Sequence, residues 1–162
     1  MIPFRLGDYE KAGTWLGEGL ASARMAGDRF SRYMALYNHS QLAQAQDDTD
    51  GAARLFEEGL AFSREVGDRA NVGYCLEGLA DVAVARGAPQ RAARLLGAAE
   101  SLFESVGARM YGHRPGRQLH DKLVAEAHSQ LGEQAFNAAW DEGHAMTAEQ
   151  MVEYALTSER AG

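Results

Sequence analysis

The sequence DGAARLFEEGLAFSREVGDRANVGYCLEGLADVAVARG, residues 50–87, decides the fold of this chain. It contains two amphipathic helical patterns, which meet at the pair Gly67-Asp68. The same outline recurs at a fixed spacing, because the step from Gly27 to Gly67 equals the step from Gly67 to Gly107 (67 − 27 = 107 − 67 = 40). A fixed period of this length is typical of a helical solenoid, in which each unit buries its apolar face only against its neighbours.

The hydrophobic pattern predicts an all-α chain, because no stretch alternates apolar and polar residues with the period of two that a strand requires. Glycines, prolines and capping residues predict where each helix begins and ends. Gly27 should end the first helix in the left-handed conformation, and Asp28 should cap the second. Thr147 and Gln150 form a capping-box pattern before the last helix. The predicted helices cover about residues 8–26, 29–47, 50–66, 69–86, 89–106, 115–131, 133–142 and 147–156.

Residues at helical spacing on one side of each pattern are predicted to form the core. In the first helix these residues are Trp15, Leu16, Gly19, Leu20 and Ala23. In the repeated part they include Leu36, His39, Leu55, Phe56, Leu60, Leu76, Leu79, Leu96 and Phe103. Near the C-terminal end they are Ala135, Phe136, Ala139 and Trp140. We interpret His39 as a buried histidine with its hydrogen bonds satisfied.

Composition narrows the functional classes. The chain has 162 residues, a net charge of −7 and a pI near 5.2, which disfavours binding to nucleic acid or to an anionic membrane surface. Cys75 is the only cysteine, so no disulfide can form within the chain, and we expect it to be a buried thiol. No apolar run is long enough to cross a bilayer, and the first residues lack a signal-peptide layout. These features predict a cytoplasmic protein.

We expect one domain over residues 1–162, with repeats over 1–107, a helical C-terminal cap over 108–158 and a frayed tail over 159–162. The first helix matches the second helix of a repeat, so its own partner would lie upstream of Met1. Two explanations stay open. The chain is a fragment of a larger protein or has an atypical start, or its uncapped first helix forms a homodimer through Ile2, Phe4 and Leu6. We favour the first explanation.

The repeated unit resembles the tetratricopeptide repeat. Leu6-Gly7-Asp8-Tyr9-Glu10-Lys11-Ala12 resembles that family's turn into its second helix, and Leu16, Gly19 and Leu20 follow at the family's spacing. The matching positions in later units are filled by Ala52, Phe56, Gly59, Leu60, Ala92, Leu96 and Ala99. The unit departs from the family in its length of 40 rather than about 34 residues, and in having leucine at positions 36 and 76, where tryptophan is favoured. The resemblance implies a right-handed α-solenoid of about 2.5 helical hairpins.

A narrower resemblance covers the C-terminal half. The runs RGAPQRAARLLGAAESLFESVGARM (residues 86–110) and LGEQAFNAAWDEGHAMTAEQMVEYAL (residues 131–156) are similar to the C-terminal repeat region of large bacterial LuxR-type and STAND-ATPase regulators. This resemblance implies an interaction module of a transcription or signalling regulator. No GxxxxGK[ST] phosphate-binding loop and no basic recognition helix is present, so no ATPase or DNA-binding residue carries over.

In tetratricopeptide folds the first helix of each hairpin lines a concave groove, and this resemblance implies the partner-binding residues. They are Met34, Tyr37, Gln41, Gln44, Tyr74, Glu77, Asp81, Arg114 and Arg117. Tyrosines beside polar side chains suit a peptide or a partner domain, because they combine apolar area with directional hydrogen bonds. The simpler alternative is an ordinary solvated helix face. A second functional hypothesis is a small-ligand sensor whose pocket lies between this groove and the helix over residues 114–131.

The sequence predicts no catalytic residue, metal site or cofactor. Glu77 and Asp81 are four residues apart on one helix face, where exposure to water would leave them as an acidic stripe rather than as a catalytic pair. None of the five histidines is spaced to share a metal with another. The acidic run at residues 47–50 fails the calcium-loop pattern. The basic cluster Arg109, His113, Arg114 and Arg117 would clamp a carboxylate or phosphate, or simply balance nearby acidic charge.

Overall fold

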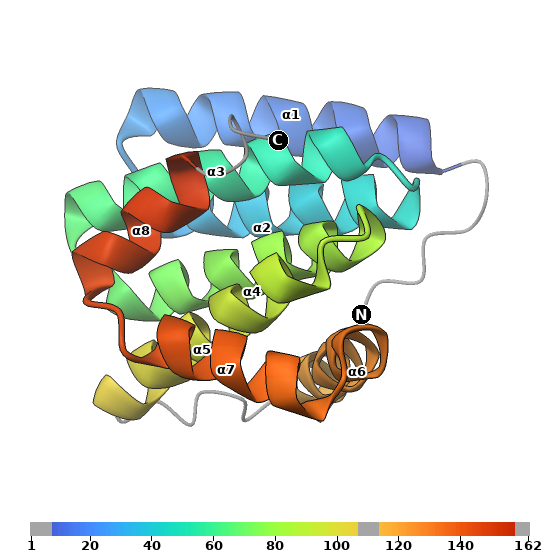
Figure 1. Ribbon diagram of the computed structural model, residues 1–162. Helices are drawn as coiled ribbons and strands as arrows, with labels where there is room; N and C mark the ends of the chain where they lie inside the picture. The colour runs from blue at the N-terminus through green and yellow to red at the C-terminus, as the bar shows by residue number, and fades with distance from the viewer. Residues whose placement is uncertain (1–7, 107–113, 158–162) are drawn as a thin grey trace. The chain divides into compact units, whose positions relative to one another are not determined.

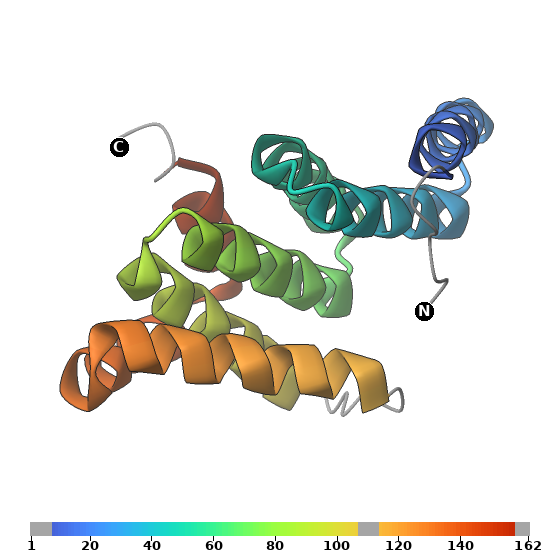
Figure 2. The same ribbon diagram turned by 90° about the vertical axis from the view of Figure 1, so that its right-hand side faces the viewer.

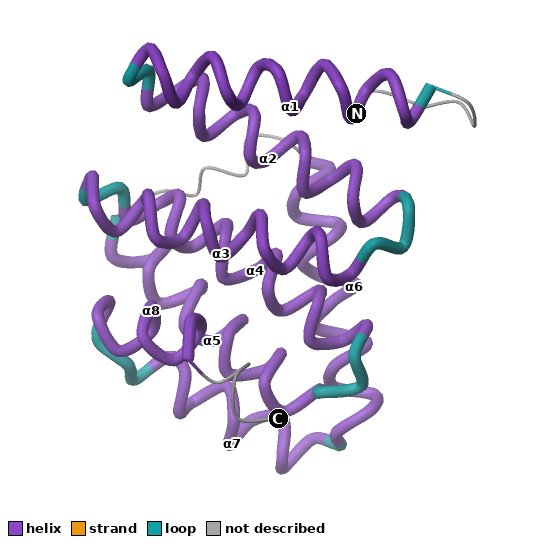
Figure 3. Tube along the Cα trace, turned by 90° about the horizontal axis from the view of Figure 1, so that it is seen from above, coloured by secondary structure: helices purple, strands orange, loops and turns teal. Residues whose placement is uncertain are grey.

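The computed structural model describes residues 8–106 and 114–157, with the side chains of residues 114–119 left out. The described residues form eight α-helices and no strand, which confirms the all-α prediction (Figure 3). The helices are α1 (Tyr9–Ala26), α2 (Arg29–Ala45), α3 (Thr49–Val66), α4 (Arg69–Ala85), α5 (Pro89–Ser105), α6 (Arg114–Leu131), α7 (Glu133–His144) and α8 (Ala148–Thr157). The predicted loop over residues 108–113 and the predicted tail lie outside the described residues, apart from Thr157, which belongs to α8.

The helix starts follow the spacing seen in the sequence. The helices α1, α3 and α5 begin at Tyr9, Thr49 and Pro89, and the helices α2 and α4 begin at Arg29 and Arg69. Each start therefore follows its counterpart by the same step (49 − 9 = 89 − 49 = 69 − 29 = 40). This spacing gives the described part of the chain a repeat-like helical character.

Matched glycines and aspartates set the boundaries between helices. Gly27 and Gly67 both adopt the left-handed conformation, with φ of 66° and 72°. Asp28 then accepts hydrogen bonds from the backbone amides two and three residues ahead, at 3.1 and 3.2 Å. Asp68 accepts one from the amide three residues ahead, at 3.1 Å. These bonds satisfy amides that have no partner inside the helix, and they confirm the predicted cap at Asp28.

The turn before α3 and the turn before α5 share a second left-handed position. Asp47 has φ of 56°, and Gly87, at the matching position of the next turn, has φ of 71°. A side chain in this conformation crowds the following carbonyl, which is why glycine adopts it most easily. Asp47 therefore holds a strained backbone position that the next turn fills with glycine. At the far end of the chain, Thr147 and Gln150 exchange hydrogen bonds at 2.9 and 3.2 Å, which confirms the capping box before α8.

The chain packs into two compact units, Met1–Gly59 and Leu60–Gly162. In the first unit α1 packs against α2 (Figure 1), and Leu20, Leu36 and Leu42 are buried there. Trp15 is 71% exposed, so its predicted place in the core is wrong. It lies one residue before Leu16, which turns its side chain about 100° away from the buried side of α1. The buried side follows Ala12, Leu20 and Ala23, and Gly19 is exposed.

In the second unit α5 is the central helix. It contacts α4, α6, α7 and α8, and Figure 2 shows α4 and α6 running beside it. The predicted core residues Leu76, Leu79, Leu96 and Phe103 are all buried, at 5% exposure or less. Ala135 is exposed, so its predicted place on the buried face of α7 is wrong. That face is formed by Phe136, Ala139 and Gly143, which recur every three or four residues.

Two glycines bring α5 and α7 into backbone contact. A Cβ atom on Gly97 would lie 2.2 Å from the carbonyl oxygen of Trp140, and one on Gly143 would lie 1.9 Å from the carbonyl oxygen of Arg94. Only glycine fits at both positions, because each contact is with backbone that a side-chain movement cannot relieve. Beside this crossing the Arg94 guanidinium pairs with the carboxylate of Glu142 at 2.5 Å.

Hydrogen bonding and stacking attach α8 to α5. Arg91 of α5 donates a hydrogen bond to the carbonyl oxygen of Ala155 at 2.9 Å. Its guanidinium also lies 5.2 Å from the ring centre of Tyr154, within cation–π range. Across residues 8–106 and 114–157, no helix has both the length and the apolar character needed to cross a membrane.

Candidate interaction surface

The outward face of α2 carries an exposed apolar stripe. Phe30, Met34 and Tyr37 are 74%, 37% and 39% exposed, and their spacing of four and three residues places them on one face of the helix. We call these three residues the α2 stripe. Tyr33 and Tyr37 stack with ring centres 6.2 Å apart, which holds one end of the stripe in place. Sequence reasoning proposed Met34 and Tyr37 but missed Phe30, although its position four residues before Met34 was a sufficient signal.

The stripe continues into polar side chains toward the end of α2. Gln41 and Gln44 follow Tyr37 by four and seven residues, so they lie on the same face, and both are half-buried. Four of the predicted groove residues therefore share one helix face in the first unit. Their aromatic and thioether groups offer apolar area, and their amides offer hydrogen-bond donors and acceptors.

In the second unit Tyr74, Glu77 and Asp81 share one face of α4 and are all half-buried. The Tyr74 ring packs edge-on against Phe103 of α5, with ring centres 5.2 Å apart and planes 60° apart. Gly73 lies beneath the same phenyl ring, since a Cβ there would come within 2.7 Å of it. Tyr74 is thus part of the α4–α5 packing as well as of the surface.

Glu77 is engaged with a neighbouring helix. Its Oε1 lies 2.7 Å from Nδ1 of His120 on α6, and the two side chains are 12% and 16% exposed. The hydrogen bond that His120 donates to Glu77 raises the pKa of His120, partial burial opposes that rise, and the charges of Glu77, Glu100 and Asp121 add to it. The prediction of a solvated acidic stripe is therefore wrong for Glu77, whose carboxylate bridges α4 and α6.

The remaining predicted groove residues lie on α6. Arg114 and Arg117 belong to its first turns, where only the backbone is described. Arg109 and His113 of the predicted basic cluster lie outside the described residues. Both the anion clamp and the small-ligand pocket beside this helix stay predictions.

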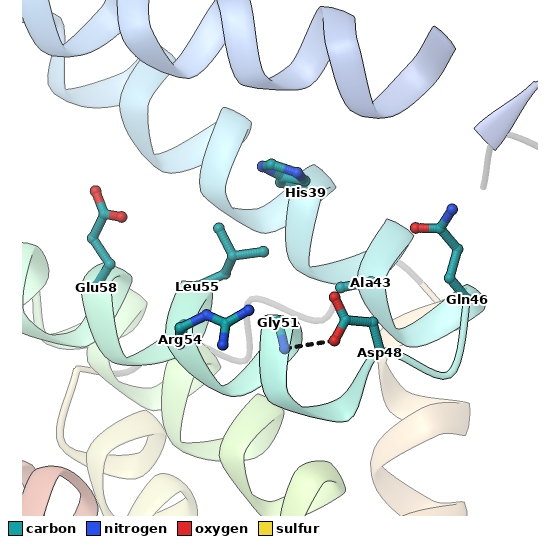
Figure 4. Close-up of a pocket in the computed structure, with 8 residues that line it drawn as sticks. All are labelled: His39, Ala43, Gln46, Asp48, Gly51, Arg54, Leu55 and Glu58. Carbon is teal, nitrogen blue, oxygen red and sulfur yellow. Dashed lines mark hydrogen bonds between the residues drawn. The ribbon is translucent and has the colours of Figure 1, made fainter. Parts of the chain in front are cut away.

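His39 differs from its interpretation as a satisfied core histidine. It is half-buried, and its Nδ1 atom is shielded from solvent without a hydrogen-bond partner among the described residues. Its ring lines an open pocket of about 390 Å³ between α2 and α3 (Figure 4), which we call the α2–α3 pocket. The lining residues are His39, Ala43, Gln46, Asp48, Gly51, Arg54, Leu55 and Glu58. Sequence reasoning missed this pocket, because its residues come from two different helical patterns.

Two further observations concern reactive or metal-binding side chains. Cys75 is buried as predicted, and burial, with a smaller contribution from Asp68, raises the pKa of its thiol to about 12. Within the described residues, no three histidine, cysteine or carboxylate side chains are grouped so that they could hold a metal ion.

Comparison of the chain with protein families, with characterised proteins and with solved structures finds no match. The class of protein must therefore be argued from the described residues themselves. They form an all-α, repeat-like chain with an exposed aromatic stripe on α2 and a polar bridge between α4 and α6.

Proposed function

We propose that this chain is a non-catalytic interaction module of a bacterial transcription or signalling regulator, built as a right-handed solenoid of tetratricopeptide-like hairpins. Helix starts that recur at one fixed spacing support the repeat architecture. The similarity of residues 86–110 and 131–156 to the C-terminal region of such regulators supports the biological setting. Those two runs supply α5, α7 and α8, and α5 contacts both of the other helices in the second unit.

The observation that carries this function is the α2 stripe. Phe30, Met34 and Tyr37 place apolar groups in water along one helix face, where burial by a partner would be favourable. Aromatic residues supply much of the energy in protein interfaces, and methionine adapts its flexible side chain to different surfaces. The proposed ligand is a peptide segment with apolar side chains, or a helix of another domain of the same regulator.

The charge of the side chains on α2 also favours a particular kind of peptide. Arg29 is an exposed basic side chain next to Phe30, and α2 contains no Asp or Glu. A peptide that places an acidic residue near its apolar anchors would gain favourable charge interactions at this face. We therefore propose that the preferred peptide combines apolar residues with acidic ones.

The test begins with selection of binding peptides from a random displayed library on the intact chain. The dissociation constant of a selected peptide is then measured for the wild type and for the double variant Met34→Ser/Tyr37→Ser. We expect at least about a tenfold loss of affinity, because two exposed anchors are removed. Peptides enriched in apolar and acidic residues would support the proposed preference.

Met25→Ser is the matched control, because Met25 is 90% exposed but lies at the end of α1 rather than on the α2 stripe. Its affinity for the peptide should equal that of the wild type, and all variants should keep the wild-type far-UV circular dichroism. Equal affinity of the double variant and the control, or a library that yields no binder, would contradict the proposed function.

A further inference from the structure

The α2–α3 pocket is a separate feature from the α2 stripe, and nothing in the proposed function uses it. Its walls come from α2 and α3 within the first unit, and the segment that joins these helices closes one end (Figure 4). Leu55 and Ala43 supply apolar wall, while His39, Arg54 and Glu58 supply ionisable groups. A volume of about 390 Å³ falls within the range of small-molecule sites.

The two carboxylates of the pocket already have partners. Nε of Arg24 donates a hydrogen bond to Oε1 of Glu58 at 3.0 Å, and a guanidinium nitrogen of Arg32 lies 3.5 Å from the same oxygen. Asp48 caps α3, accepting a hydrogen bond from the backbone amide of Gly51 at 2.8 Å. The charge of Glu58 is therefore balanced by two arginines, whereas Asp48 is fixed in place as the cap of α3.

Arg54 is a basic residue of the pocket without an ion-pair partner among the described residues. It is exposed, and it has no hydrogen bond or ion pair with another described residue. Glu58, four residues later on α3, would be its usual helical partner, but Arg24 and Arg32 hold that carboxylate. Figure 4 shows the Glu58 carboxylate directed away from Arg54, whose guanidinium points toward the Gly51 end of the pocket.

His39 adds a second unsatisfied polar group. Its Nδ1 atom is shielded from water and has no partner in the described part of the chain, although a buried polar atom without a hydrogen bond costs free energy. Because a water-sized atom cannot reach Nδ1, a ligand in the pocket would meet the rest of the His39 ring rather than this atom. The unpaired guanidinium of Arg54 is the group that favours an anionic ligand.

We propose that the α2–α3 pocket binds a small carboxylate with an apolar body. The guanidinium of Arg54 pairs with the carboxylate, since its paired N–H groups match the two carboxylate oxygens. The apolar body packs against Leu55 and Ala43. Phosphate-sized anions without an apolar group bind more weakly, because they leave the Leu55 wall in water.

Sodium phenylacetate is a suitable probe, and the intact chain is titrated with it by isothermal calorimetry and by NMR. We expect saturable binding at millimolar concentration, and an affinity for phenylacetate that is at least about tenfold lower in Arg54→Gln than in the wild type. Arg64→Gln is the matched control, because Arg64 is an exposed arginine on the same helix outside the pocket. Its affinity should match that of the wild type. Arg54 is exposed, so its substitution should leave the fold intact.

Benzylamine, which carries a positive charge on a similar apolar body, tests the charge preference. We expect it to bind at least about tenfold more weakly than phenylacetate. Three results would each overturn the proposal: no saturable binding of phenylacetate, equal affinity in Arg54→Gln and wild type, or binding of benzylamine as tight as that of phenylacetate. None of them bears on peptide binding at the α2 stripe, so the two proposals stand or fall separately.

Discussion

Glu77 of α4 and His120 of α6 meet through a contact of 2.7 Å between Oε1 and Nδ1, across 43 residues of sequence. Both side chains are largely buried, so water weakens their interaction less than it weakens an exposed ion pair. The pair gives α4 and α6 a polar link in addition to the contacts that each makes with α5. Its strength depends on whether the imidazole carries a proton.

The stability of the second unit should therefore fall as the pH rises above the ordinary range of histidine. The folded pKa of His120 is raised, chiefly by the hydrogen bond that it donates to Glu77, so the folded state binds the proton more tightly than the unfolded state. This contribution is fully present below the unfolded pKa of about 6.5 and is lost as the pH rises through the higher folded pKa. Urea unfolding between about pH 6 and pH 8.5 should show the decrease.

His120→Gln should remove this pH dependence. At the acidic end of the pH range it should lower the free energy of unfolding by about 1 kcal/mol. Trp140 is the only tryptophan of the second unit, so its fluorescence in a Trp15→Phe background reports on that unit. His144→Gln is the control, because His144 contacts Glu104 at 2.9 Å with both side chains well exposed. If His120→Gln and the wild type lose stability in parallel as the pH rises, the assignment to His120 is wrong.

Ala88 precedes α5 without a side-chain cap, whereas Asp48, at the matching position of the previous turn, caps α3. In Ala88→Asp the new carboxylate should accept a hydrogen bond from the amide of Arg91, three residues ahead, as Asp68 does from that of Asn71. We expect the free energy of unfolding to rise by about 1 kcal/mol. Ala88→Asn keeps the capping oxygen without the charge, so it separates the hydrogen bond from the charge effect. A decrease in stability for both variants would show that the two turns differ in geometry.

Local signals explain why the helix boundaries could be predicted. Gly27, Asp28 and Thr147 act on amides within three residues of themselves, so a short stretch of sequence contains all the information they need. The spacing of apolar residues predicts the buried face of a helix less reliably where two neighbouring residues are both apolar. Trp15 and Leu16 are such a pair, and spacing alone does not show that Trp15 is the exposed one. The α2 stripe was partly predictable, because helical spacing alone relates Met34 to Tyr37.

Partner choice between distant residues could not be predicted. Glu58 pairs with Arg24, 34 residues away, in preference to Arg54, which is four residues away on its own helix. Helical spacing favours the nearer pair, so only the packing within the first unit reveals that Arg54 is left without this partner. The same limit applies to His120 and Glu77, whose contact depends on how α6 returns to α4.

Cys75 should be almost unreactive in the folded protein. Burial raises the pKa of its thiol to about 12, so at about pH 8 roughly one thiol in ten thousand is ionised. An aromatic disulfide reagent should label the folded chain at least about 100-fold more slowly than the urea-unfolded chain, because the thiolate is the reacting species. Since Cys75 is the only cysteine, the labelling rate reports on this residue alone. Rapid labelling of the folded chain would place the thiol at a reactive surface.

The contact between α5 and α7 should be the part of the second unit that tolerates substitution least. In Gly143→Ala the new Cβ would meet the carbonyl oxygen of Arg94 at 1.9 Å, and in Gly97→Ala it would meet that of Trp140 at 2.2 Å. Each helix must move away to relieve the overlap, so we expect each variant to lose about 3 kcal/mol or more of stability, at the upper end of overpacking costs.

Gly19→Ala provides the contrast, because no described atom beyond its chain neighbours and the backbone of α1 lies within 4 Å of the Cβ that it would add. This variant should gain about 0.5–1 kcal/mol, since alanine restricts the unfolded chain and favours helix. Thermal unfolding followed by circular dichroism measures all three variants, and Trp140 fluorescence reports on the two in the second unit. The double variant Gly97→Ala/Gly143→Ala adds a sharper criterion. Once one alanine has separated the helices, the second should cost less than it does alone, because both act on the same helix–helix distance. Strictly additive losses would mean that the two glycines relieve independent contacts.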